Sequence, residues 1–138
     1  MSLPKNEANF DFDHLGELTG KRYEGQFTVK CVLDLADKRA LEIEKSRLTA
    51  DLLNPTGNLS ALGSVIANLR VRVLDGPDWF LQTISTLKGL LDEEVIFELY
   101  GKCLEKSDEW RESIKKKAIE KIKETEESES EGNVQTES

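Results

Sequence analysis

The sequence predicts a mainly α-helical fold, one compact domain of four to five helices with one β-strand or hairpin near its N-terminus. Two observations predict it: apolar residues recur at helical spacing over residues 34–122, whereas residues 23–33 alternate between apolar and polar side chains. A chain of 138 residues is most often one domain. We therefore predict an N-terminal arm over residues 1–18, the helical domain over 19–123, and a disordered acidic tail over 124–138.

Residues 1–18 mix Asn, Asp, Gly and Pro with a few apolar residues and show no sustained period, which is typical of an arm. The strand that follows has Tyr23, Phe27 and Val29 on one side and polar residues on the other. Gly25 within it indicates a bulge or a close backbone approach. A single strand leaves backbone groups unpaired, so either residues 15–18 pair with it across a turn at 19–22, or another copy or another protein does. We expect a homo-oligomer on this basis.

The helices are predicted from apolar stripes and from the residues that start and stop them. Asp34 or Asp37 can cap a first helix that ends near Leu53, before Asn54-Pro55. The second helix starts near Asn58 or Ser60 and carries its stripe to Val73, and the third is short and aromatic after Gly76-Pro77. A fourth begins after Asp92, and a joint at Ser107-Asp108 leads to a fifth with Trp110, Ile114, Ala118 and Ile122 in register.

The charge of the chain is concentrated at its end. The formal net charge is −8, from 19 Lys and Arg against 27 Asp and Glu, and residues 124–138 hold six of the carboxylates and no basic residue. The remaining chain is nearly neutral, which argues against a surface built to bind nucleic acid. No apolar run approaches the roughly 18 residues needed to span a bilayer, and the first residues lack the pattern of a secretory signal. We expect a soluble, cytoplasmic protein that binds neither nucleic acid nor membrane.

Sequence motifs for catalysis or cofactor binding are weak. Asp11, Asp13 and His14 lie together but lack the Gly and Glu of a calcium loop, so an ordinary loop is the favoured interpretation. Cys31 and Cys103 fall in the apolar register of their elements, which favours reduced core residues over a nucleophile or a zinc site. The chain has no glycine-rich phosphate-binding motif. We predict no metal, no cofactor and no enzymatic activity, with a small enzyme site around His14 as the third alternative.

Residues 111–123 form a basic amphipathic segment, with six basic and two acidic residues. Such a helix can lie on a membrane, on nucleic acid or in a partner's groove, or be an ordinary solvated helix end. The acidic tail that follows can fold back and screen these lysines, which favours a protein partner or self-neutralisation over DNA. With one apolar side chain, Val134, the tail cannot bury enough surface to become ordered and is predicted to be disordered.

Adjacent aromatic residues give the best candidates for a protein contact. Trp79 and Phe80 diverge by about 100° on a helix, so one of them can be exposed beside the Gly-Pro break. The predicted partner-binding residues are those of the strand and of the aromatic helix positions: Tyr23, Phe27, Val29, Trp79, Phe80 and Trp110.

The order of several short motifs resembles a known class of proteins. These motifs are GKRYEGQFTV at residues 20–29, LRVRV at 69–73, PDWF at 77–80, LD at 91–92 with VI at 95–96 and LY at 99–100, and WR at 110–111. Their order resembles that of small proteins encoded in the tail-gene module of long-tailed bacteriophages, several of them described as tail assembly chaperones. The likeness covers residues 20–111.

The resemblance implies a function without an active site. A tail assembly chaperone coats the aggregation-prone tape-measure protein before the tail tube polymerises around it, and is then released. We therefore expect a non-enzymatic phage morphogenesis protein that binds the tape-measure protein in the host cell cytoplasm. The alternative is a minor structural virion component or an intracellular protein–protein adaptor. Particle composition separates the two, because a chaperone is absent from finished virions.

Overall fold

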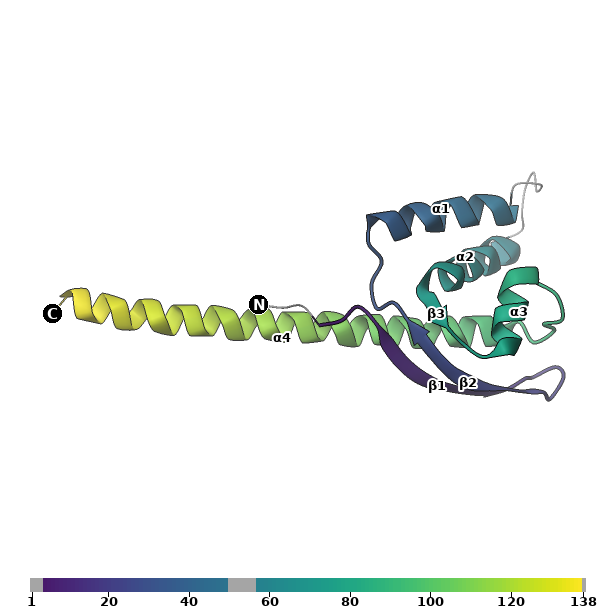
Figure 1. Cartoon of the computed structure of the whole chain (residues 1–138), viewed down its shortest axis with the longest axis horizontal. Coiled ribbons are helices and arrows are strands. Elements are labelled where there is room, and N and C mark those ends of the chain that lie inside the picture. The colour runs from purple at the N-terminus through teal and green to yellow at the C-terminus, as the bar shows by residue number, and fades with distance from the viewer. Residues whose placement is uncertain (1–3, 50–56, 138) are drawn as a thin grey trace.

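In the computed structural model, which describes residues 4–49 and 57–137, four helices lie on one side of a three-stranded antiparallel sheet (Figure 1). The elements follow in the order β1 (Ala8–Leu15), β2 (Arg22–Val29), α1 (Leu35–Thr49), α2 (Gly57–Arg72), β3 (Val73–Asp75), α3 (Asp78–Thr86) and α4 (Glu94–Glu137). The first turns of α4 lie against α2 and β1, and the rest of this helix projects far from the other elements. No helix within the described ranges is long and apolar enough to cross a membrane.

The sheet corrects the predicted fold class. The prediction of a helical domain with one strand or hairpin is wrong, because β3 joins β2 and makes a three-stranded sheet in the order β1-β2-β3. Val73 was assigned to the end of a helical stripe, yet it lies opposite Val29 in the ladder. Three residues are too few for a visible period-2 pattern, and only the pairing with β2 makes this segment a strand.

The strand of residues 22–29 has its partners within the chain. Strand β1 pairs with it over eight residues, with Phe10 opposite Phe27 and Leu15 opposite Arg22. The segment predicted as an arm therefore contains a strand, and the turn that joins the two is closed by the Gly16 amide, which donates to the Lys21 carbonyl at 2.7 Å. Because β2 is the central strand, the unpaired-strand argument for a homo-oligomer no longer holds.

The core lies between the sheet and the helices and is rich in aromatic rings. Phe27 is fully buried and contacts Phe10, Phe12 and Phe80 at ring-centroid distances of 5.1 to 5.8 Å. Aliphatic residues of α2 and α4 complete this core: Val65, Leu69, Val95, Ile96 and Leu99. The expected close approach at Gly25 is present, since a Cβ there would lie 2.6 Å from Pro77 Cγ.

Helix α1 begins at the predicted cap and is the least buried helix. The Asp34 carboxylate accepts a hydrogen bond from the Asp37 amide at 2.8 Å. The Asp37 carboxylate in turn accepts one from the Asp34 amide at 3.2 Å. None of the described side chains of α1 is fully buried, so this helix rests on α2 by one partly buried face. Its predicted end near Leu53 lies outside the described residues.

Helix α4 is a single helix of 44 residues, about 66 Å long at 1.5 Å per residue. The joint predicted at Ser107-Asp108 is absent, because Ser107 is 3 % exposed and packs inside the domain while the helix continues past it. The helix also includes residues 124–137, for which the composition predicts disorder. The boundaries predicted for the arm, the domain and the tail stay predictions.

Candidate functional site

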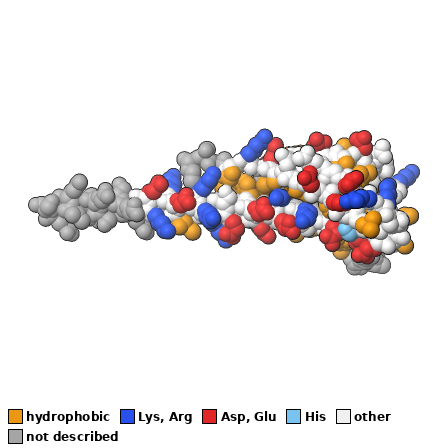
Figure 2. All heavy atoms as spheres, turned by 90° about the horizontal axis from the view of Figure 1, so that it is seen from below, with side chains coloured by type: hydrophobic (Ala, Val, Ile, Leu, Met, Phe, Trp, Pro, Cys, Tyr) orange, Lys and Arg blue, Asp and Glu red, His pale blue; other side chains and the backbone are white. Residues whose placement is uncertain are grey.

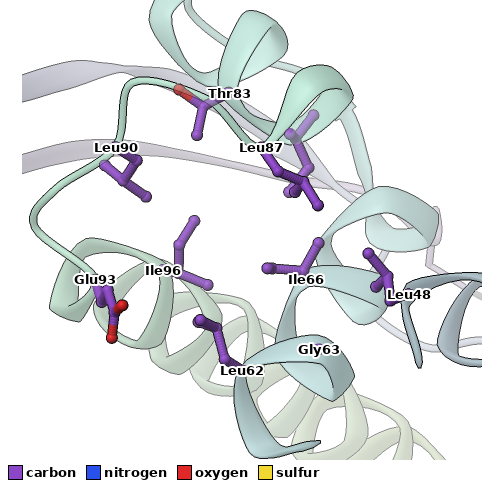
Figure 3. Close-up of a pocket in the computed structure, with 10 residues that line it drawn as sticks. Leu48, Leu62, Gly63, Ile66, Thr83, Leu87, Leu90, Glu93 and Ile96 are labelled. Atoms are coloured by element: carbon purple, nitrogen blue, oxygen red, sulfur yellow. The ribbon is translucent and has the colours of Figure 1, made fainter. Parts of the chain in front are cut away.

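An apolar pocket of about 220 Å³ opens between α2, α3 and the start of α4 (Figure 3). Ile66, Leu87, Leu90 and Ile96 point into it from different elements. Its full lining is Leu48 of α1, Leu62, Gly63 and Ile66 of α2, Thr83 and Ile84 of α3, Leu87, Leu90 and Glu93 of the segment between α3 and α4, and Ile96 of α4. Several of these side chains also pack on the core, so the pocket is an open extension of it.

Leu87 stands at the pocket in an unusual backbone conformation. It follows the last residue of α3 with φ 62° and ψ 17°, and its amide donates to the Thr83 carbonyl at 2.7 Å. This left-handed conformation at the end of a helix usually belongs to glycine, because a Cβ there costs roughly 1 kcal/mol. Among the described residues no other non-glycine residue has a positive φ. A large aliphatic side chain is thus held beside the pocket, 47 % exposed, against a backbone penalty.

Three consecutive carboxylates at the start of α4 point to three different surroundings. Asp92 is buried against the hairpin, and Glu94 Oε2 lies 3.3 Å from His14 Nε2. Glu93 is exposed at the pocket and has no ion-pair partner among the described residues. The pocket therefore has one unpaired negative charge beside an aliphatic lining.

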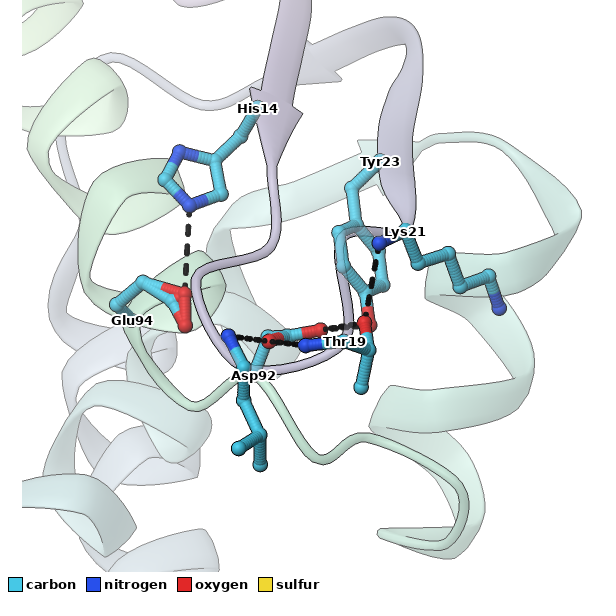
Figure 4. Close-up of polar contacts among 7 residues, drawn as sticks. His14, Thr19, Lys21, Tyr23, Asp92 and Glu94 are labelled. Carbon is cyan, nitrogen blue, oxygen red and sulfur yellow. Dashed lines mark hydrogen bonds and ion pairs between the residues drawn. The ribbon is translucent and has the colours of Figure 1, made fainter.

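Asp92 is the polar group that holds this region together (Figure 4). It accepts hydrogen bonds from the amides of Leu18 and Thr19 at 2.8 and 3.1 Å, from Thr19 Oγ1 at 2.5 Å and from the Tyr23 hydroxyl at 2.8 Å. These donors, the Thr19 hydroxyl foremost, lower the pKa of Asp92 to about 2. Burial, helped by the Asp92 charge, raises the pKa of Tyr23. The arrangement is a structural clamp between the hairpin turn and α4.

The suspected metal cluster does not converge. Successive residues of a strand point to opposite faces, so Asp11 and Asp13 face solvent while His14 turns toward α4 and Glu94. Asp13 pairs with Arg22 at 2.5 Å, and Arg22 lowers its pKa. Within residues 4–49 and 57–137 no group of three or more His, Cys, Asp and Glu is placed to hold a metal ion.

Both cysteines lie in the core, as predicted. Cys31 is 2 % exposed and Cys103 is fully buried, and both are free thiols. Burial raises the pKa of Cys103 to about 11 and raises that of Cys31. Thiols that stay protonated at neutral pH are poor nucleophiles. His14 of β1 is engaged with Glu94 of α4.

Four of the predicted partner-binding residues are structural. Tyr23, Phe27, Val29 and Phe80 are at most 3 % exposed and belong to the core cluster. Their side chains are buried in this conformation, and their assignment as partner-binding residues stays a prediction. The alternation that marked them identifies the inward face of β2, and the aromatic side chains of α3 pack on that face.

The two tryptophans lie at intermediate depth. Trp79 packs on Tyr23 and Phe27, and its Nε1 donates to the Glu24 carbonyl at 2.8 Å, so it mainly ties α3 to β2. Trp110 lies on α4 beyond the last fully buried residue of that helix, and its Nε1 is shielded from solvent without a hydrogen-bond partner in the described parts of the chain. Of the six predicted residues, Trp79 and Trp110 alone reach the surface.

The projecting part of α4 carries the basic segment. Lys115 and Lys116 are exposed, and Ile119 and Ile122 are 54 % and 56 % exposed. Figure 2 shows basic and acidic side chains interspersed around this rod, with hydrophobic side chains gathered over the domain beside it. The described surface of this part of α4 therefore mixes charged and exposed aliphatic side chains.

Sequence reasoning missed the pocket, although it found parts of its lining. Leu62, Gly63 and Ile66 lie within the predicted second helix, and Ile84 lies within the predicted third helix. The missing signal is long-range, because the lining spans residues 48 to 96. Comparison of the chain with protein-family models, with curated proteins and with solved structures finds no match in any of the three.

Proposed function

We propose that this protein binds another protein stoichiometrically and has no catalytic role, and that it acts as a tail assembly chaperone of a long-tailed bacteriophage. The observation that carries the proposal is the apolar pocket beside Leu87, an open, aliphatic extension of the core. Apolar hollows of this kind are typical of sites that receive side chains from a partner. The resemblance of residues 20–111 supplies the phage context and the partner, the tape-measure protein.

The chemistry of the described polar groups supports a binding role over a small enzyme. Asp92 is occupied by four hydrogen bonds, His14 by Glu94 and Asp13 by Arg22. The apolar pocket contains one carboxylate, Glu93, and one hydroxyl, Thr83, with no second titratable group to serve as an acid–base pair.

The acidic end of the chain fits a chaperone that must stay soluble while it displays apolar surface. Six carboxylates in residues 124–138 supply most of the net charge of −8. Like-charged tails repel one another and limit aggregation of unbound copies. In this proposal the protein acts in the host cytoplasm, and several copies of it bind along one tape-measure chain.

The projecting rod of α4 favours the second candidate, a virion component or adaptor. Some 45 Å of helix follows Ser107, which is buried, and the described side chains of this part include the exposed Ile119 and Ile122. A long exposed helix suits a protein that remains attached to neighbours in a finished particle.

Co-expression with the tape-measure protein tests the proposal. We expect the tagged chain to retain the tape-measure protein on an affinity column and to raise its soluble fraction, and to be absent from purified virions. A chain that does not retain the tape-measure protein contradicts the chaperone function. Retention of the chain in virions at fixed copy number favours the structural alternative.

A further inference from the structure

We infer that the apolar pocket receives an aliphatic pair from one face of a partner's amphipathic helix, and that Glu93 selects a helix with a lysine or arginine beside that pair. The inference rests on the proposed protein-binding function and names the chemistry of the partner. It assigns binding roles to Leu87 and Glu93, neither of which the sequence singled out.

The size of the pocket decides the kind of occupant. Sites for drug-sized molecules usually enclose about 300 to 1,000 Å³, and the volume here is about 220 Å³. That space suits one or two aliphatic side chains. Residues three or four apart on a helix project from the same side, so a pair from one turn can enter together. Walls from three helices, with Ile66, Ile84 and Ile96, form the aliphatic surface that such a pair would contact.

Leu87 is the feature that the fold alone does not explain. Glycine at this helix end would keep the bond from its amide to Thr83 and remove the strain at φ 62°. The leucine side chain is about half exposed at 47 %, so it contributes little core packing in return. Strained residues cluster at sites where function requires the side chain. Because Leu87 lines the pocket, we assign its side chain the function of contacting the occupant.

Glu93 places a negative charge at the pocket. The two neighbouring carboxylates are engaged, Asp92 by the hairpin and Glu94 by His14, whereas Glu93 has no ion-pair partner in the described parts of the chain. A helix with Lys or Arg one turn from its aliphatic pair would place a cation opposite this carboxylate. A helix with Glu or Asp there would be repelled, so the carboxylate sorts partners by charge.

Synthetic helices test the inference directly. The probes are alanine-based helical peptides with one leucine pair three residues apart and with either lysines or glutamates on the adjacent turn. We expect the full chain to bind the lysine peptide about three- to fivefold more tightly than the glutamate peptide at low salt, as for one exposed ion pair. Glu93→Gln should remove that preference, whereas Glu98→Gln, which changes an exposed carboxylate of α4 outside the pocket, should keep it.

The leucine is tested with substitutions that its backbone accepts. Leu87→Gly and Leu87→Asn both suit a left-handed residue, so the variants should keep the melting temperature of the wild type. We expect each to weaken both peptides at least about fivefold. Leu91→Ala, which removes a 65 % exposed leucine outside the lining, should leave affinity unchanged.

Other results overturn the inference without touching the proposed function. Equal affinity for the two peptides, or unchanged binding by both Leu87 variants, removes the assigned roles. If decanoate displaces the peptides at a concentration lower than the dissociation constant of the lysine peptide, the pocket is a site for an acyl chain. Self-association of the wild type that Glu93→Gln and Leu87→Gly abolish would make a second copy the occupant. Capture of the tape-measure protein by wild type and both variants alike would leave the chaperone function standing and refute the pocket as its site.

Discussion

The Tyr23 hydroxyl donates a hydrogen bond of 2.8 Å to Asp92 Oδ2, joining residues 69 positions apart in the chain. Tyr23 is in the central strand and Asp92 lies just before α4, so this bond fixes the hairpin to the base of the longest helix. The same segment supplies Leu90 and Glu93 to the apolar pocket. The clamp at Asp92 therefore sets the position of one wall of the proposed binding site.

Tyr23→Phe should destabilise the fold by about 1.5 kcal/mol. The ring keeps its contacts, but the buried carboxylate loses one of its four hydrogen bonds, and bonds to charged groups are worth roughly 1.5 to 3 kcal/mol. Urea unfolding followed by circular dichroism measures the change. Tyr100→Phe is the matched control and should change stability little, because the partly buried Tyr100 hydroxyl makes no hydrogen bond to the described residues. Equal effects from the two variants would contradict the clamp.

The hydrogen bonds to Asp92 should make the free energy of unfolding depend on pH in the acidic range. The pKa of Asp92 falls from 3.8 to about 2 on folding, so the folded state favours its ionised form. A carboxyl with a lowered folded-state pKa contributes stability above its unfolded pKa and loses it as the pH falls through the folded value. The gap in unfolding free energy between wild type and Asp92→Asn should be constant above about pH 4 and shrink toward pH 2.

Urea unfolding at a series of pH values measures that gap. Asp108→Asn, at an exposed position on α4, serves as the control and should show almost no gap at any pH. A gap for Asp92→Asn that stays the same from neutral pH down to pH 2 would show that ionisation of Asp92 does not stabilise the fold.

Two glycine-to-alanine substitutions should change the stability of the fold in opposite directions. Gly25 lies in β2 with φ 155°, and an added Cβ would meet Pro77 Cγ at 2.6 Å, so Gly25→Ala should cost about 1 to 3 kcal/mol. Gly101 lies inside α4 with open space around it, so Gly101→Ala should stabilise by about 0.5 to 1 kcal/mol. Thermal unfolding of both variants provides the measurement, and a Gly25→Ala variant as stable as wild type would refute the close approach.

Local patterns of the sequence predicted elements well where the pattern was long. The alternation around Phe27 identified β2, and the cap at Asp34 identified the start of α1. Strand β1 has the same alternation, with Phe10 and Phe12 inward, but Asn and Asp occupy its outer positions and have low strand propensity. Cross-strand pairing with β2 outweighs that propensity, and pairing is not visible in a local window.

The site was beyond local patterns for a related reason. An inward-facing aromatic residue such as Phe27 and a partner-binding one leave the same mark on a sequence, and only the folded arrangement separates them. The positive φ of Leu87 has no sequence signal either, because leucine is an ordinary helix residue and Gly89 nearby is the expected helix stop. The pocket depends on four segments that meet in space.

The acidic end should be dispensable for the fold and important for solubility. Ending the chain after Lys123 removes six carboxylates and changes the formal net charge from −8 to −2. The core cluster of the described residues ends at Cys103, so the urea midpoint should stay the same. Static light scattering should show stronger attraction between copies, because repulsion falls with net charge. A lower urea midpoint would show that residues 124–138 pack on the domain.

Helix α1 should open before the rest of the domain. Arg70 holds it in place, with Nη1 donating to Glu44 Oε2 of α1 at 2.9 Å and Nε donating to the Ile84 carbonyl of α3 at 2.8 Å. The Asp37 carboxylate of α1 also pairs with Lys30 Nζ at 2.6 Å. The described side chains of α1 are otherwise at most partly buried, so its opening exposes little apolar surface. Amide hydrogen exchange should be faster in α1 than in β2 or α2.

Glu44→Gln should widen that difference, because it leaves the partly buried Arg70 without its counter-charge. We expect exchange in α1 to rise several-fold while the free energy of global unfolding falls by no more than about 1 kcal/mol, the range of a partly exposed ion pair. Glu42→Gln, in the exposed pair with Lys45 on the same helix, should leave exchange unchanged. Since Leu48 of α1 forms one wall of the pocket, Glu44→Gln should also weaken binding of the leucine peptides. Faster exchange in α1 with unchanged peptide affinity would show that α1 is not needed for the site.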